Sequence, residues 1–193
     1  MANFVRVAAD PAFSAHVSLV ATMLIDEIPF ELESTSDIAG PAFETTTTLV
    51  VADESLRTQV IMVDGKTYVR LGTGGWRSVP GAADPRDVNP FAGLEPSDLR
   101  YLKAQSVGGR VLHRLRLEAL PIDPAKVATS RVEDVEVDLA TFEVLVDDAG
   151  RPVLGYYDFT GSALIEGARQ AITIDADYRF SRIGEPITIE PPI

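Results

Sequence analysis

The chain has 193 residues, 46% of them hydrophobic and 24% charged, which fits one globular domain over residues 1–193 and excludes wholesale disorder. Lys and Arg number 17 against 29 Asp and Glu, so the formal net charge of −12 argues against a nucleic-acid partner, which requires a basic face. The absence of cysteine excludes disulfides, thiol catalysis and zinc–thiolate sites.

The N-terminal segments change from a short helical pattern to alternation with a period of two. Residues 2–9 predict a short helix, which Pro11 ends. Apolar residues then fall on every second position over 13–25. Over 30–38 one face carries Phe30, Leu32, Ser34, Ser36 and Ile38, and the other carries Glu31, Glu33, Thr35 and Asp37. This alternation predicts two half-buried antiparallel strands that form a hairpin.

The following segments also predict strands and tight turns. Residues 43–51 are rich in β-branched side chains, which favour the pleated conformation. Residues 56–63 and 66–71 flank Asp64-Gly65, and both turn residues tolerate a positive φ, so a hairpin is predicted. Residues 81–89 are rich in Pro, Gly and Asp and predict an irregular connection.

The second half of the chain predicts short helices followed by longer strands. One or two helices are expected within 91–102, and a further small helix over 121–128. A hairpin of strands 101–107 and 110–117 is predicted around Gly108-Gly109. Strands 132–146, 152–165 and 168–180, joined by turns, complete the chain.

These elements predict a mainly β (α+β) domain of about ten antiparallel strands and a few short helices. A sheet of this size must curl or split in two to bury its apolar face, so a half-barrel and a two-sheet sandwich both remain open. The helices need an apolar surface, which the concave side of a curved sheet offers. We therefore expect an unclosed antiparallel β half-barrel packed over short helices.

No motif in the sequence indicates catalysis or metal binding. His16 and His113 lie far apart within predicted strands and lack the spacing of metal ligands. Residues 147–150 begin like a calcium loop but lack the further oxygen ligands, so a hairpin turn is predicted. The glycine-rich residues 72–75 precede no helix, and Gly161 opens no nucleophile elbow. We expect no enzymatic activity and no cofactor.

Two groups of charged residues have a structural and a functional interpretation. Basic residues share one face of the strand 110–117, and acidic residues share one face of the strand 132–146; they are Arg110, Arg114, Arg116, Asp134, Glu136 and Asp138. Cross-strand ion pairs on a solvated face are the structural interpretation, and a basic spot for an anionic headgroup is the functional one. Trp76 is expected to fill a core or a barrel end.

Three segments resemble the LolA/LolB-type lipoprotein-carrier superfamily, and most closely the LppX/LprG-type cell-envelope lipoproteins. They are the run 63–69 (VDGKTYV) followed by Gly75-Trp76, the run 90–94 (PFAGL), and the C-terminal run 178–189 with its Gly-Glu-Pro. The resemblance covers nearly the whole chain. It implies an unclosed barrel over helices with a cavity between sheet and helices that accepts acyl chains.

The resemblance also implies a function and a location. It implies an extracytoplasmic, non-catalytic domain that binds or carries lipid or another apolar ligand, together with an export or carrier partner protein. It further implies lipid anchoring to the outer face of the plasma membrane. The first ten residues lack a signal peptide and a lipobox cysteine, and we expect both to precede Met1 in the full-length protein.

A set of apolar residues is expected to line the cavity, because methionines and aliphatic side chains suit an adaptable apolar pocket. They are Val17, Leu19, Met23, Leu32, Val60, Met62, Phe91, Leu94, Leu99, Val111, Leu115, Ile172 and Ile174. The same residues could instead pack solidly against one another and leave an envelope scaffold or interaction module without a cavity. A hydrolase with convergent carboxylates is the third hypothesis.

Overall fold

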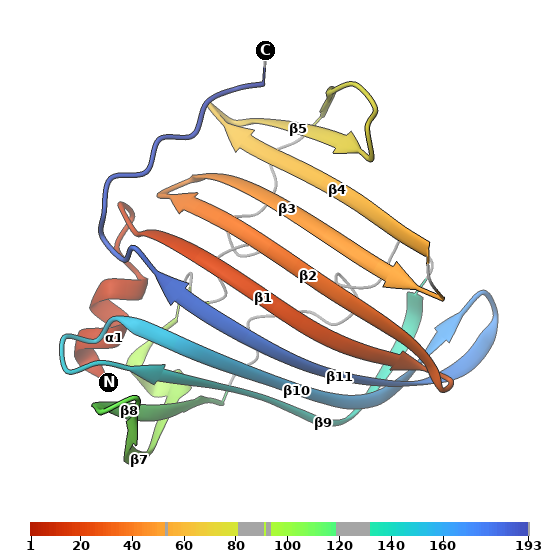
Figure 1. Cartoon of the computed structure of the whole chain (residues 1–193). Helices are drawn as coiled ribbons and strands as arrows, with labels where there is room; N and C mark the ends of the chain where they lie inside the picture. The colour runs from red at the N-terminus through yellow and green to blue at the C-terminus, as the bar shows by residue number, and fades with distance from the viewer. Residues whose placement is uncertain (53, 81–90, 92–93, 119–131, 193) are drawn as a thin grey trace.

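One curved antiparallel sheet dominates the protein (Figure 1). The structure, a computed structural model, describes residues 1–52, 54–80, 91, 94–118 and 132–192. Within these residues eleven strands follow the order β6-β5-β4-β3-β2-β1-β11-β10-β9-β8-β7. The strands β6 and β7 lie at opposite edges and do not pair, so the half-barrel is open, as the sequence predicted.

The strands match the predicted segments closely and exceed the predicted number by one. They are β1 (Ser14–Ile25), β2 (Ile28–Ala39), β3 (Ala42–Val51), β4 (Glu54–Val63), β5 (Lys66–Leu71), β6 (Arg77–Val79), β7 (Leu99–Val107), β8 (Arg110–Leu117), β9 (Val132–Val146), β10 (Pro152–Ile165) and β11 (Ala168–Ser181). The short edge strand β6 had not been predicted. The remaining elements of the described residues are the helix α1 (Ala2–Ala8) and the 3-10 turn η2 (Pro96–Asp98).

The two ends of the chain meet in the middle of the sheet. β1 pairs with β11 over a register that runs from His16 opposite Ser181 to Ile25 opposite Ile172. Two series of hairpins extend from this central pair, one through β2 to β6 and the other through β10 to β7. Sequence-local hairpins therefore build both wings, and a single long-range pairing joins them.

One side of the sheet, here called the concave face, packs against α1 and forms the main core. It carries every second residue of each strand; on β1 these include Ala15 and Val17, and on β11 Phe180. Phe4 and Ala8 of α1 are buried in the same cluster. The other side, the convex face, carries the intervening residues. Alternation of side chains thus gives the two faces different chemistry.

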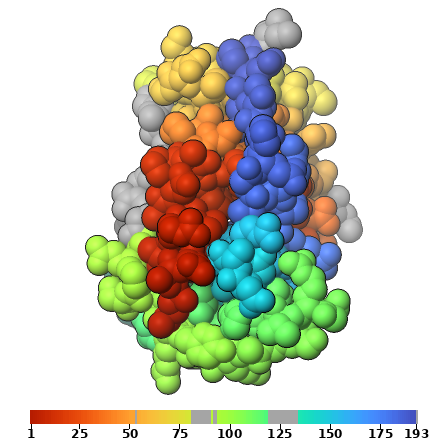
Figure 2. Space-filling model, turned by 90° about the vertical axis from the view of Figure 1, so that its left-hand side faces the viewer, coloured from red at the N-terminus to blue at the C-terminus, as the bar shows by residue number. Residues whose placement is uncertain are grey.

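Close backbone contacts fix α1 and the C-terminal segment at one end of the half-barrel. A Cβ added to Gly150, in the β9–β10 turn, would lie 2.5 Å from the carbonyl carbon of Asn3. The backbone N–H of Gly184 donates to the carbonyl of Ser14 over 3.0 Å, which binds the segment after β11 to the start of β1. Figure 2 shows the N- and C-terminal segments side by side at this end.

The middle of the chain differs from the prediction. Helices were expected within 91–102, but the 3-10 turn at Pro96–Asp98 is followed directly by β7 from Leu99. Burial of Leu99 in the sheet outweighs the short apolar pattern that had indicated a helix. The helix expected over 121–128 lies outside the described residues.

We predict that replacing Gly150 by Ala destabilises the protein more than the same change at Gly167. Both glycines have a positive φ, 81° and 83°, so both variants bear the same backbone strain. Only at Gly150 does the added methyl group collide with the backbone of α1. Urea denaturation should give a loss of about 1 kcal/mol for Gly167→Ala and about 1–3 kcal/mol more for Gly150→Ala. Equal losses would show that the α1 contact contributes nothing.

Candidate functional site

The concave face of the central strands is uncharged. The register places Val17 of β1 beside Ser36 of β2 and Phe180 of β11. Every second residue from these positions lies on the concave face, and the pairings extend the same face to β3 and β10. None of these positions holds Asp, Glu, Lys, Arg or His. The acidic residues of the same strands lie at their ends, in the turns or on the convex face. A ligand on these strands would therefore meet only apolar and neutral polar groups.

At the end near α1 an aromatic cluster fills the concave face. The Phe91 ring meets those of Phe4, Phe142 and Phe180 at centroid distances of 5.0, 5.9 and 5.3 Å. Phe4, Phe91 and Phe142 are fully buried. Edge-on ring pairs at these distances are favourable beyond the area that they bury. This part of the interior is a packed core that joins α1 to the sheet.

The concave face of β2 to β5 is less covered. Leu32, Val60 and Val69 are half-buried there, and Leu71 at the end of β5 is 60% exposed. Apolar side chains of this kind on an inward surface are available to an apolar ligand. Phe43, Met62 and Thr67 are buried on the same face, so the open part of the concave face is the part of this wing beyond them, around Val60, Val69 and Leu71.

A cluster of four side-chain hydroxyls on β2 and β3 interrupts this apolar surface. The hydroxyl of Ser34 shares hydrogen bonds with those of Thr45 and Thr47, over 3.2 and 3.0 Å. The Ser36 hydroxyl donates to that of Thr45 over 2.8 Å. Each hydroxyl oxygen can accept two hydrogen bonds, so the hydroxyl cluster can still form hydrogen bonds with a neutral polar partner.

Two tyrosines extend into the apolar part of the concave face. Tyr157 of β10 pairs with Ala176 of β11, and its hydroxyl is buried without a hydrogen-bond partner. Burial raises the pKa of Tyr157 to about 12. Burial, and then the nearby Tyr157, raise the pKa of Tyr178 above its ordinary value. Both side chains are therefore neutral hydrogen-bond donors at physiological pH.

Most of the residues expected to line a cavity lie together on the concave side of the molecule. The main core contains seven of them: Val17, Phe91, Leu94, Leu99, Leu115, Ile172 and Ile174. Leu19, Met23 and Leu32 are partly buried against that core. Val60 and Met62 share the concave face on β4 but lie outside the main cluster.

Val111 does not join this surface, because it lies next to the β7–β8 turn and is 56% exposed. The sequence analysis also missed the two tyrosines and the hydroxyl cluster. Strand alternation could have identified them, because residues two apart on a strand face the same side. Tyr157 therefore faces the same side as Phe159, and Ser34 the same side as Leu32. The search for apolar residues alone passed over these neutral polar positions.

Charged residues on the convex face form cross-strand ion pairs, as the structural interpretation held. Glu143 of β9 is only 6% exposed and binds Arg114 and Arg116 of β8, the latter over 2.7 Å. Arg169 of β11 pairs with Asp134 and with Glu136. Four of the six charged residues singled out in the sequence, Arg114, Arg116, Asp134 and Glu136, thus bind partners on neighbouring strands.

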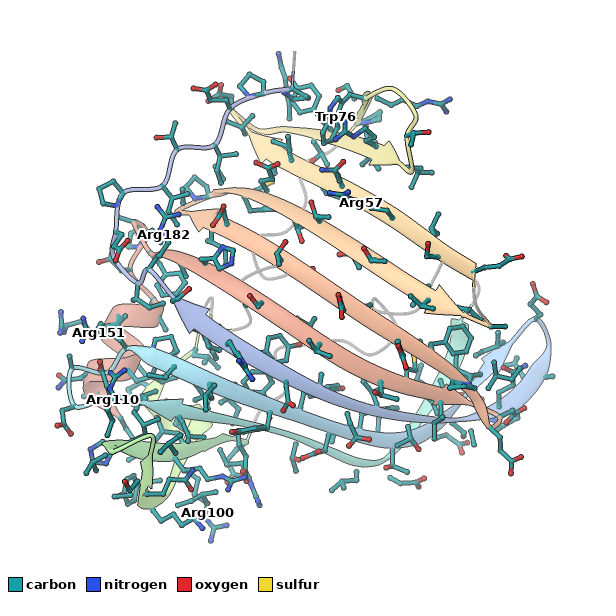
Figure 3. All side chains as sticks on the ribbon, viewed as in Figure 1. Arg57, Trp76, Arg100, Arg110, Arg151 and Arg182 are labelled. Carbon is teal, nitrogen blue, oxygen red and sulfur yellow. The ribbon has the colours of Figure 1, made fainter. Side chains whose placement is uncertain are left out.

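Two further arginines, Arg110 and Arg151, lie beside the β9–β10 turn (Figure 3). Arg151 pairs with Asp147 over 2.8 Å, and Arg110 lies 3.9 Å from the same carboxylate. Hydrogen bonds from Arg151 and Ala149 hold the pKa of Asp147 below its ordinary value, although burial acts against them.

Trp76 is half-buried, and the guanidinium carbon of Arg70 lies over its ring, 4.7 Å from the ring centroid.

The two histidines have carboxylate partners on the surface. His16 lies 2.9 Å from Asp37, and His113 lies 2.9 Å from Asp148. Among the described residues, no group of three or more His, Cys, Asp and Glu side chains could hold a metal ion. The described helices include none long and apolar enough to cross a membrane.

Comparison with known proteins gives similarity at the level of structure. No protein-family model matches the chain, and no curated protein matches its sequence. Among solved structures, MucB is 15% identical with a TM-score of 0.38, and the match covers 98% of this chain but only 60% of MucB. The present chain thus spans less than two thirds of the length of that protein.

Two further similar structures cover nearly the whole of both chains. A LolA superfamily protein from Nitrosomonas europaea is 10% identical with a TM-score of 0.34, over 94% of this chain and 90% of its own. A lipoprotein-sorting protein domain of the outer membrane from Vibrio parahaemolyticus, described as putative, is 11% identical with a TM-score of 0.32, over 97% and 92%. One of these structures is therefore from the superfamily that the sequence resembles. All these TM-scores lie below 0.5, so these similarities carry no conclusion about function.

We predict that Glu143→Gln destabilises the protein by about 1–3 kcal/mol, because it leaves two arginines without their shared carboxylate. The loss stays below that of a fully buried pair because Arg114 and Arg116 are partly exposed and water compensates them. Glu136→Gln is the control, since that side chain is 67% exposed and its pair with Arg169 measures 3.6 Å. Its unfolding free energy should change by less than about 0.5 kcal/mol. Similar losses in both variants would contradict a special role for Glu143.

We predict that stability falls as the pH rises from about 10 towards 12. Tyrosine in the unfolded chain has a pKa near 10.0, and burial raises that of Tyr157 to about 12. In this window the unfolded state loses the proton and the folded state keeps it, so unfolding becomes more favourable with pH. Denaturation midpoints between pH 8 and 11.5 should decline less steeply in Tyr157→Phe. An identical decline in both proteins would show that Tyr157 does not titrate as a buried group.

Proposed function

We propose that this protein is a non-catalytic binder or carrier of lipid or another apolar ligand, and that the ligand lies on the concave face of the half-barrel. The uncharged concave face of five adjacent strands carries this proposal. Such a surface offers an acyl chain apolar contact along its length and no competing charge. Each methylene group removed from water contributes roughly 0.8 kcal/mol, so a chain of ten contributes enough to offset the cost of association.

The division of the concave face supports a bound chain rather than complete filling by the protein. The aromatic cluster around Phe91 fixes α1 against the sheet and closes one end. The half-buried residues of β2 to β5 leave apolar surface on the other wing. A ligand that covers Leu32 and Val60 would complete the burial that the protein's described residues leave partial.

The location and partners follow from the resemblance seen in the sequence. We propose that the protein acts outside the cytoplasm in the cell envelope, with a lipid anchor attached upstream of the present sequence. A carrier needs a second protein to deliver or receive its ligand, so an export or carrier partner belongs to the proposal. The acidic net charge of −12 would keep the convex face away from anionic lipid headgroups.

An envelope scaffold with the same fold and no ligand is the alternative. The packed aromatic rings near α1 favour it for that end of the molecule, since they leave no room among themselves. The alternative predicts that hydrophobic probes and lipids fail to bind the folded protein.

Replacing Leu19 by Trp should test the proposal. Leu19 is half-buried on the concave face of β1, between Ser34 and Tyr178, so a larger ring there would displace part of a bound chain. Displacing two methylenes corresponds to about a tenfold loss of affinity. Val20→Trp is the control, because Val20 is the next residue, lies on the convex face and is 57% exposed.

The measurement combines native mass spectrometry of protein purified from a lipid-containing host with displacement of the fluorescent probe N-phenyl-1-naphthylamine. Wild type and Val20→Trp should retain extractable acyl lipid and bind the probe, whereas Leu19→Trp should retain less lipid and bind the probe about tenfold more weakly. A clean apo mass and no probe binding by the wild type would refute lipid binding and favour the scaffold.

A further inference from the structure

The hydroxyl of Tyr157 is a polar group enclosed by the apolar interior. Its side chain is 3% exposed, and its ring lies near Phe142 and Phe159 at centroid distances of 6.4 and 6.5 Å. The hydroxyl oxygen has no hydrogen-bond partner. It is the one buried side-chain polar atom in this condition among the described residues.

An unpartnered buried hydroxyl is unfavourable in the protein alone. Buried polar atoms nearly always have a partner, because leaving one without a hydrogen bond forfeits its interaction with water. Phenylalanine would fill the same space without this loss. The presence of a tyrosine therefore indicates a partner that the described part of the chain does not supply.

A path of short side chains leads from Tyr157 towards the open wing. The register places Tyr157, Ala176, Ala21 and Leu32 in one row across β10, β11, β1 and β2. Leu19 and Tyr178 occupy the row on one side, and Met23 and Ile174 the row on the other. Three strand spacings of about 4.8 Å separate the ends of the row, a span of about 14 Å along the sheet. The side chains of the two alanines are shorter than those of the neighbouring rows on both sides.

We infer that Tyr157 is a ligand-positioning residue, whose hydroxyl donates a hydrogen bond to an uncharged acceptor of the bound lipid, such as an ester carbonyl. The inference rests on the proposed function and specifies the ligand class and its orientation. The chain of the ligand lies over Ala176 and Ala21 towards Leu32, and its acceptor group lies at Tyr157.

The charge pattern selects an ester over a carboxylate. The concave positions of the five central strands hold no cation that could neutralise a buried anion. An ionised carboxylate moved into such surroundings would lose its hydration without compensation. Because burial raises the pKa of Tyr157 to about 12, the phenol remains protonated and donates throughout the physiological range.

The experiment compares three probes: methyl laurate, which has an ester carbonyl; tetradecane, which has the same number of chain atoms and no carbonyl; and laurate, which has the same acyl chain and is anionic. Dissociation constants come from displacement of N-phenyl-1-naphthylamine at pH 8, with the probes delivered from cyclodextrin. The variants are Tyr157→Phe and, as the matched control, Tyr156→Phe. Tyr156 is the next residue on the same strand, lies on the convex face and contacts Arg114.

We expect the wild type to bind methyl laurate more tightly than tetradecane or laurate. Tyr157→Phe should weaken the binding of methyl laurate by about 3- to 10-fold, which is the contribution of one hydrogen bond, and leave the affinity for tetradecane unchanged. Tyr156→Phe should change neither. The melting temperature of Tyr157→Phe should be unchanged or higher, because the substitution removes an unpartnered buried hydroxyl.

Each contrary result identifies what has failed. An unchanged preference for methyl laurate over tetradecane in Tyr157→Phe would overturn the role of the hydroxyl while binding itself stands. Laurate that binds as tightly as the ester would overturn the neutral ligand class. A wild type that binds neither the fluorescent probe nor any of the three ligands would refute the proposed function, and the positioning role with it.

Discussion

A sheet of eleven strands has two faces, and the described residues form no second sheet that could cover either of them. The sheet can bury an apolar face only by curving it inwards around other parts of the same chain. Pairing of β1 with β11 makes this possible, because it joins two hairpin series into one continuous surface. Strand alternation then sorts the residues, and apolar side chains line the inside while ion pairs and acidic residues lie outside.

The concave face combines a rigid part with an accessible part. Around Phe91 the rings of the sheet and of α1 are packed as in an ordinary core, which fixes the curvature at that end. Towards β5 the same face offers apolar and hydroxyl side chains that the described chain covers only in part. A surface of this kind is held in shape by the packed end, so the ligand that we propose would not have to form it.

Local sequence patterns predicted most of this fold. Alternation over 13–25 and 168–180 gave β1 and β11, and Asp64-Gly65 gave the β4–β5 turn, because these signals depend on neighbours in the chain. The pairing of β1 with β11 joins residues more than 150 positions apart, and no local pattern contains it. The helix expected within 91–102 failed for a related reason, since β7 gains its place from pairing with β8 rather than from its own periodicity. For the site, hydrophobicity found Val17 and Ile174 but not Tyr157, whose importance lies in what surrounds its hydroxyl.

We propose that a lipid chain lies on the concave face. Nuclear magnetic resonance of methyl-labelled protein tests it most directly, by measuring magnetisation transfer from the chain protons of bound methyl laurate to individual leucines. Leu32 lies on the concave face of β2, and Leu24, 40% exposed, lies on the convex face of the adjacent β1. The account predicts transfer to Leu32 and Leu19 and none to Leu24. Transfer to Leu24 without transfer to Leu32, or no transfer to any leucine at saturating ligand, would contradict it.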